Sequence, residues 1–129
     1  MTATTGSDSI VLDSSGWLEY LTDGSKASAF APYLEGDATV LVPSIVIYEV
    51  RKILQLKQSK TLADIFLSDV LRRTIVSFDD VLAIQSADLS IQHRLAMADA
   101  IIYATARHYD VPLITSDNHF ANLAGVTIL

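Results

Sequence analysis

Short apolar runs alternate with longer amphipathic stretches along the whole chain. The runs at residues 9–13, 39–43, 74–78, 111–116 and 126–129 are rich in β-branched residues and are bounded by polar ones. Runs of this length and composition are typical of strands buried in a parallel sheet. The pattern therefore predicts about five strands.

The stretches between these runs carry apolar residues at helical spacing. A short helix follows the first strand and ends near Gly24, and a single helical turn is expected within residues 118–123. Pro43 and Ser44 favour the start of a helix, and Asp79 and Asp80 are suited to cap another. The remaining predicted helices cover residues 26–34, 44–58, 61–71, 81–93 and 98–109.

The alternation of strands and helices predicts an α/β fold, a three-layer α/β/α sandwich around a parallel sheet. The 129 residues fit one domain, which we place at residues 9–129, preceded by a short flexible tail at residues 1–8. The beginning of the chain does not have the pattern of a signal peptide, and no apolar stretch approaches the roughly 20 residues that span a bilayer. With no cysteine in the sequence, the expected location is the cytoplasm.

Four carboxylates interrupt the apolar pattern. Asp13 ends the first strand, Glu49 lies inside the apolar run "SIVIYEV", Asp99 opens the helix before the fourth strand, and Asp117 directly follows that strand. Ligands of open parallel sheets bind outside the carboxyl ends of the strands, where the strand order reverses. With a strand order of 3-2-1-4-5, Asp13 and Asp117 face the same crevice. Glu49 would lie at the same edge, and Asp99 would do so if its helix begins there.

Carboxylates that repel one another need protons or cations. Oxygen ligands suit Mg²⁺ or Mn²⁺, whereas zinc is disfavoured because the chain has no cysteine and its histidines do not have zinc-site spacing. Each acid also has a simpler interpretation. The aspartates are common helix caps or turn residues, and Glu49 is suited to pair with Lys52. We read His93, His108 and His119 as surface or satisfied residues, with a weak case for His119, which stands two positions after Asp117.

The overall charge argues against simple electrostatic binding of nucleic acid. The chain has 15 acidic residues against 9 Lys and Arg, and thus a formal net charge of −6. Bound divalent cations would lower this negative charge. Several basic residues fall in two groups, and solvated helix faces explain both groups at least as well. The first group holds Arg51, Lys52, Lys57 and Lys60, and the second holds Arg72 and Arg73. The mean hydropathy of +0.36 leaves open whether part of the apolar surface faces a partner subunit.

The motifs "VLDSSGWLEYL", "PSIVIYEV", "ADAIIYATA" and "LITSDNHF" follow one another in this order. Together they resemble PIN-domain ribonucleases and, at this chain length, the VapC-type toxins of toxin–antitoxin pairs. The resemblance covers nearly the whole chain from residue 9 onward.

The resemblance implies that Asp13, Glu49, Asp99 and Asp117 form the acidic quartet that binds Mg²⁺ or Mn²⁺ and cleaves RNA to leave 5′-phosphate and 3′-hydroxyl ends. Thr115 and Ser14 match supporting hydroxyl positions, while Asn118 stands where some relatives carry a further acid, which would weaken a second metal. The resemblance also implies a cognate antitoxin and a homodimer, with RNA approaching bases such as Arg51 or Lys52.

Two alternatives stay open at this point. A phosphatase of the haloacid-dehalogenase type needs Asp-x-Asp at the first strand, where this chain has Asp13-Ser14-Ser15. A PIN-like domain that binds a partner without catalysis would not need metal-dependent stabilisation.

Overall fold

The structure is a computed structural model that describes residues 8–129. In this part of the chain five parallel strands form one sheet in the order β3-β2-β1-β4-β5, which is the order considered above for bringing Asp13 and Asp117 together. The strands are β1 (Ser9–Leu12), β2 (Thr39–Pro43), β3 (Thr74–Val76), β4 (Leu113–Thr115) and β5 (Val126–Ile128).

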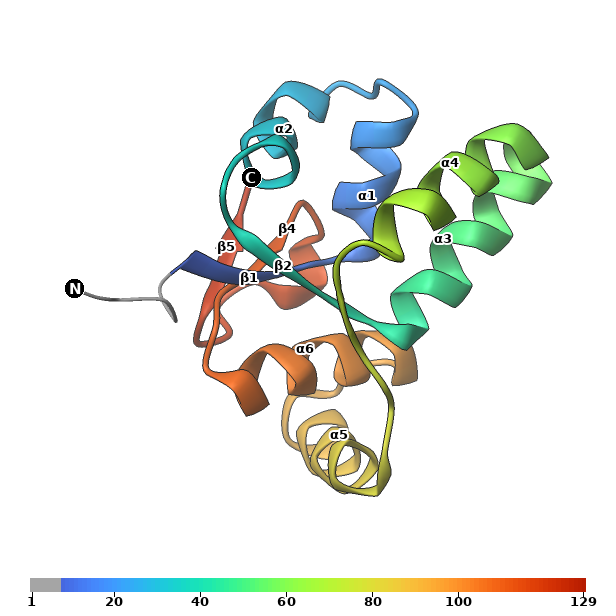
Figure 1. The fold of residues 1–129 in the computed structure, drawn as a ribbon. Helices are drawn as coiled ribbons and strands as arrows, with labels where there is room; N and C mark the ends of the chain where they lie inside the picture. Colours follow the sequence, from blue (N-terminus) through green and yellow to red (C-terminus); the bar gives the residue numbers. More distant parts are fainter. Residues whose placement is uncertain (1–7) are drawn as a thin grey trace.

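Helices cover both faces of the sheet, so the three-layer α/β/α prediction is confirmed (Figure 1). Helices α1 to α4 lie on one face, and α5 and α6 lie on the other (Figure 1). The helices are α1 (Ser14–Leu21), α2 (Ala27–Glu35), α3 (Ser44–Lys57), α4 (Lys60–Val70), α5 (Asp80–His93) and α6 (Met97–Tyr109), with a 3₁₀ turn η2 (Asn118–Phe120) before the last strand. The predicted helix bounds differ from these by one or two residues at most ends.

The connections place a switch point between β1 and β4. From β1 through β2 to β3 the chain moves in one direction across the sheet, and right-handed crossovers therefore put α1 to α4 on the same face. The crossover from β3 to β4 moves the other way and puts α5 and α6 on the opposite face. The carboxyl ends of β1 and β4 thus lie beside each other where the strand order reverses, which is where ligands bind in such sheets.

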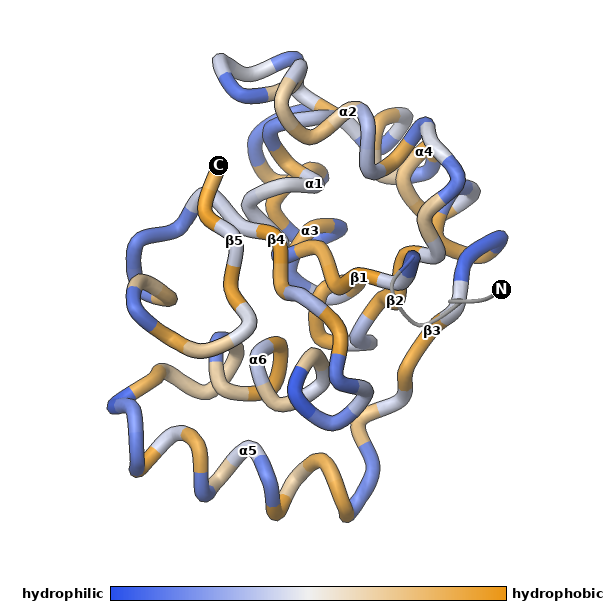
Figure 2. Tube along the Cα trace, turned by 90° about the vertical axis from the view of Figure 1, so that its left-hand side faces the viewer, coloured by the Kyte–Doolittle hydropathy of each residue, from blue (hydrophilic) through white to orange (hydrophobic). Residues whose placement is uncertain are grey.

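The core is formed by the sheet and the inner faces of the helices. Figure 2 shows β1 and β4 as hydrophobic segments in the middle of the molecule. Trp17 of α1 and Phe66 of α4 are fully buried, and their rings meet edge to face at 5.2 Å and 77°. Such aromatic pairs add to the free energy gained from burying their area. The contact fixes α1 and α4 relative to each other above the sheet.

Gly16 allows α1 to approach β1 closely. A Cβ atom at this position would stand 2.8 Å from Leu12 Cδ1 and 2.8 Å from Phe30 Cε1, both of which belong to fully buried side chains. The absence of a side chain at residue 16 therefore lets the first turn of α1 lie against the end of β1. This contact sets the position of the residues between them.

The predicted tail at residues 1–8 lies outside the described residues except for Asp8. The single domain at residues 9–129 stays a prediction, and the one continuous sheet is in keeping with it. Within residues 8–129, no helix has the length and apolar character needed to cross a membrane.

The close approach at Gly16 predicts that Gly16→Ala destabilises the protein. Alanine is the better helix former by about 1 kcal/mol, but overpacking against Leu12 and Phe30 costs about 1–3 kcal/mol, so we expect a net loss of stability. Urea unfolding measures the difference. Gly24→Ala is the matched control, because its Cβ would meet mainly the flexible side chain of Glu19. Equal stability of Gly16→Ala and the wild type would show that α1 can shift without cost.

Candidate metal centre

Asp13 is a buried carboxyl group at the carboxyl end of β1. It caps the N-terminus of α1, and the residue is only 4 % exposed. The Ser14 backbone N–H donates to its Oδ1 at 2.7 Å, while the Ser15 and Thr115 hydroxyls donate to its Oδ2 at 3.0 Å and 2.8 Å. Because Thr115 ends β4, the last of these bonds ties together the ends of the two strands at the switch point.

Glu49 joins the same edge of the sheet from the second turn of α3. The Ser14 hydroxyl donates to its Oε1 at 2.7 Å. The ion pair with Lys52, which was the simpler interpretation of Glu49, does not form within residues 8–129, since the Lys52 ammonium lies 3.4 Å from the Tyr48 hydroxyl. Ser14 therefore contacts both acids, Asp13 through its backbone and Glu49 through its side chain.

Asp99 and Asp117 complete the group of acids. Asp117 follows β4 and caps η2, and its backbone N–H donates to the Thr115 hydroxyl at 2.9 Å. Asp99 lies in the first turn of α6, because this helix begins at Met97 near the same edge. His119 Nδ1 lies 3.3 Å from Asp117 Oδ1 and 3.7 Å from Asp99 Oδ2.

The electrostatics of these acids show that their charges are not fully compensated. Burial raises the pKa of Asp13, although the hydrogen bonds from Thr115, Ser15 and Ser14 partly oppose this effect. Burial and the charges of Asp13 and Asp117 raise the pKa of Asp99 to about 6. A carboxyl group with such a pKa is still mostly ionised at neutral pH, but its charge is held against repulsion, so a cation placed between these acids would be favoured.

The donor set fits a hard divalent cation. Asp99, Asp117 and His119 each offer one ligand atom, and these atoms lie within 4.8 Å of one another. Carboxylate oxygens are the ligands that Mg²⁺ and Mn²⁺ prefer, and one imidazole is compatible with a transition metal such as Mn²⁺. This group of ligand atoms is therefore compatible with a divalent metal ion.

The structure thus brings the four sequence-predicted acids to one edge of the sheet. Their role as metal ligands stays a prediction, as do the supporting roles of Thr115 and Ser14. Asp13 and Asp117 also cap helices, so the simpler interpretation holds alongside the metal interpretation rather than excluding it.

Two residues near these acids were not expected. One is Ser15, whose hydroxyl contacts Asp13, and the other is His119, which has only a weak sequence signal. The sequence holds a weak signal for both residues, because each stands two positions after a predicted acid: Ser15 after Asp13, and His119 after Asp117.

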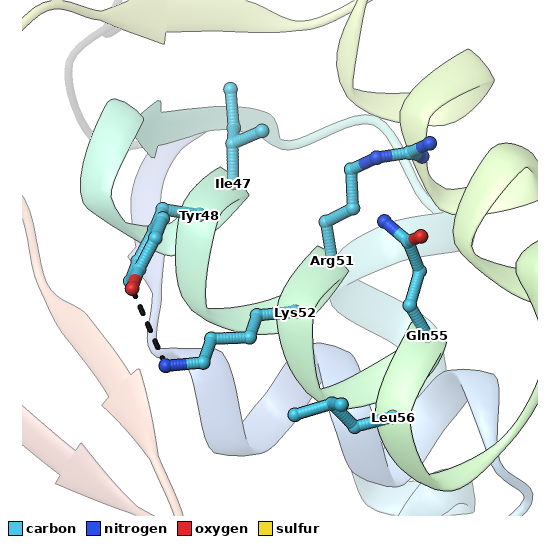
Figure 3. A pocket seen from close by; sticks show the side chains of 6 residues that line it. All are labelled: Ile47, Tyr48, Arg51, Lys52, Gln55 and Leu56. Carbon is cyan, nitrogen blue, oxygen red and sulfur yellow. Dashed lines mark hydrogen bonds between the residues drawn. The ribbon is translucent and has the colours of Figure 1, made fainter.

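The basic residues expected near the RNA are arranged differently. Arg51 donates to the Ala63 carbonyl and pairs with Asp64 at 3.1 Å, so it ties α3 to α4. Figure 3 shows Arg51 directed away from Tyr48 and Lys52, which are joined by the dashed hydrogen bond. These residues line a hollow of about 440 Å³ on the outer side of α3. Of the two expected bases, Lys52 is the one without an ion pair in the described part of the chain.

Comparison with known proteins agrees with this geometry. The family model of the PIN domain matches residues 10–126, which is nearly the whole chain. Among curated proteins, none matches this chain.

Solved structures with this fold include several toxin–antitoxin proteins. A toxin–antitoxin complex from Klebsiella pneumoniae is similar with a TM-score of 0.76 and 22 % identity, over 92 % of this chain and 95 % of its own. VapBC2 from Rickettsia felis, bound to a DNA fragment from its promoter, has a TM-score of 0.72 and 16 % identity, over 94 % and 97 %. The sarcin-ricin loop cleaving toxin VapC20 from Mycobacterium tuberculosis has a TM-score of 0.73 and 15 % identity, over 91 % and 96 %. The strand order, the acids at the switch point and the match over residues 10–126 together show that this chain belongs to the PIN domain family.

Proposed function

We propose that this chain is a Mg²⁺- or Mn²⁺-dependent endoribonuclease and the toxin of a VapC-type toxin–antitoxin pair. The observation that carries the proposal is the convergence of Asp13, Glu49, Asp99 and Asp117 where β1 and β4 end, with the pKa of Asp99 raised to about 6. The similar toxin–antitoxin structures support the biological role, and the RNA-cleaving toxin among them supports RNA as the substrate.

The four carboxylates would hold the metal. A divalent cation at such a site lowers the pKa of water and offsets the charge that develops on the scissile phosphate. These are the two effects that hydrolysis of a phosphodiester requires. No histidine base is needed for such a reaction, and none is buried at the site.

The chain's own hydroxyl groups hold the ligands in position. Ser15 and Thr115 donate to one oxygen of Asp13, and this leaves the orientation of the carboxyl group little freedom. Ser14 orients Glu49 in the same way. Hydrogen bonds of this kind around ligands commonly change metal affinity or activity by about 10–100-fold.

His119 lies beside two of the acids. Its exposed imidazole has Nδ1 3.3 Å from Asp117 Oδ1 and 3.7 Å from Asp99 Oδ2, so it is placed to join them as a ligand. Protons and a metal ion compete for the same carboxylates. Metal affinity is therefore expected to fall as the pH drops.

The proposed partners are a cognate antitoxin, an RNA substrate and a second copy of the chain. The described residues leave several large apolar side chains exposed, such as Ile65 on α4 and Ile84 and Ile91 on α5. Apolar residues exposed on opposite layers of the fold suit two separate interfaces. Both interfaces are consistent with the high mean hydropathy of the chain.

A non-catalytic PIN domain is the remaining alternative. The match to the PIN domain leaves little reason to retain the phosphatase. A binding module, however, would share the fold, and only its response to metal and RNA would distinguish it from a nuclease.

Removal of metal tests the mechanism directly. We expect EDTA to stop RNA cleavage and added Mn²⁺ or Mg²⁺ to restore it. The melting temperature should also rise with metal, since a ligand that binds only the folded state stabilises it by about 2.7 kcal/mol at a hundred times its Kd. RNA cleavage that continues in EDTA would point to a different chemistry, and a metal-insensitive melting temperature without cleavage would favour the binding module.

Asp13→Asn tests the quartet. The amide can still accept the hydrogen bonds of Ser15 and Thr115 but lacks the charge, so we expect cleavage to fall by at least about a hundredfold with an unchanged circular dichroism spectrum. Asp88→Asn on the exposed side of α5 is the charge-matched control and should keep full activity. Cleavage at the wild-type rate by Asp13→Asn would remove the acid from the mechanism.

The repulsion around Asp99 predicts an unusual dependence of stability on pH in the absence of metal. Between the unfolded value of 3.8 and the folded value of about 6, the folded protein binds more protons at Asp99 than the unfolded chain does. The contribution of this residue therefore stabilises the fold as the pH falls from 7 toward 4.

Asp99→Asn removes this cost permanently. In EDTA we expect the variant to exceed the wild type by about 2 kcal/mol at pH 7 and to match it near pH 4, as measured by urea unfolding. A constant difference between the two pH values would show that the charge of Asp99 is not responsible.

A further inference from the structure

Several basic side chains of the described residues already form ion pairs within the protein. Arg51 and Lys60 pair with Asp64, and Arg72 and Arg73 pair with Asp69. These four side chains stabilise α3, α4 and the turn after α4. A nuclease of negative net charge still needs a cation that contacts the RNA backbone beside its acidic site.

Arg94 is a basic residue that lines a hollow together with Asp99 and His119 of the candidate metal centre. It forms no ion pair within residues 8–129 and is exposed. Together with Leu95, Ala96, Asp99 and His119 it lines a hollow of about 290 Å³. This volume is close to the lower end of the roughly 300–1,000 Å³ found for small-molecule sites, so the hollow is large enough for part of a nucleotide.

The backbone of Arg94 is unusual. It adopts the left-handed conformation, with φ 58° and ψ 46°, at the C-terminal cap of α5. Glycine is the residue that favours this position, and Asn or Asp tolerate it. The other non-glycine residues with positive φ in residues 8–129 are of these tolerant types: Asp23, Asp110 and Asn122. An arginine with this conformation is a departure that suggests a use for its side chain.

The turn that carries Arg94 is held firmly. The Arg94 and Leu95 backbone N–H groups both donate to the Ser90 carbonyl, and the Ser90 hydroxyl donates to the Leu95 carbonyl at 2.7 Å. Leu95 itself is buried in the core. The Arg94 backbone is therefore fixed close to the start of α6, where Asp99 lies.

We propose that Arg94 binds a backbone phosphate of the RNA next to the scissile phosphate. The inference rests on the proposed ribonuclease function. In this arrangement the nucleotide next to the cleavage point occupies the hollow lined by Arg94, Asp99 and His119. The guanidinium supplies the positive charge that the acidic edge lacks, and it forms paired hydrogen bonds with phosphate oxygens. Contact with the backbone also predicts that Arg94 contributes affinity without selecting a base.

Arg94→Gly provides a clean test, because glycine suits the left-handed backbone and removes only the side chain. With an RNA that the wild type cleaves, we expect KM to rise about tenfold and kcat to stay within about twofold. Arg94→Lys should recover most of the affinity, and Arg94→Gln, which keeps a shorter polar side chain without the charge, should resemble Arg94→Gly.

A binding measurement separates this inference from the proposed function. Fluorescence anisotropy with a short labelled single-stranded RNA of random sequence is measured on Asp13→Asn, with and without Arg94→Gly. Adding Arg94→Gly to Asp13→Asn should weaken RNA binding about tenfold and reduce the steepness of log K against log salt concentration by about 0.7. Failure of the wild type to cleave any RNA would overturn the nuclease proposal. The anisotropy measurement would still test whether Arg94 binds RNA.

Two controls complete the design. Asp110→Gly relaxes a left-handed cap at the far end of α6, and Arg72→Gln removes an exposed charge on the other face of the sheet. Both should leave KM unchanged. Equal KM, equal affinity and an equal salt slope for Arg94→Gly and the wild type would overturn the proposal, as would a fall in kcat alone.

Discussion

The buried carboxyl group of Asp13 is the constraint around which the site is arranged. Placing a charged group at 4 % exposure is costly unless several donors face it, and three donors from α1 and β4 do so. These donors fix the start of α1 against the end of β4. Gly16 then lets this turn approach the core, and Trp17, one residue later, anchors it against Phe66. The contacts that position the site therefore also hold the fold together.

The three donors satisfy the hydrogen-bond acceptors of Asp13, but they do not neutralise the charge of the four acids. Asp99 and Asp117 add further negative charge, and the exposed His119 is the basic group that lies beside them. Repulsion of this kind would favour the binding of a cation, because the cation would offset it. The same repulsion is expected to make the stability of the fold depend on pH more than its well-packed core alone predicts.

The parts of the structure that follow from chain periodicity could be predicted from the sequence. Strand ends are visible as the last apolar residue before a polar one, so Asp13 and Asp117 could be assigned to one edge of the sheet once the strand order was inferred. Glu49 could be placed through its position on the helix face. The start of α6 near that edge, which brings in Asp99, was not secured by sequence, since it depends on how the turn after α5 directs the chain.

Side-chain partnerships were harder to predict, because they depend on residues far apart in the sequence. Arg51 was expected near RNA, yet Asp64 and the Ala63 carbonyl hold it in the interface between α3 and α4. Arg94 carried no sequence signal, because only its positive φ and the hollow beside Asp99 distinguish it from any surface arginine. The net charge of −6 is likewise a weak argument against the proposed RNA binding. Screening confines each charge to about 10 Å at ordinary salt, so the few groups around the scissile phosphate matter more than the total.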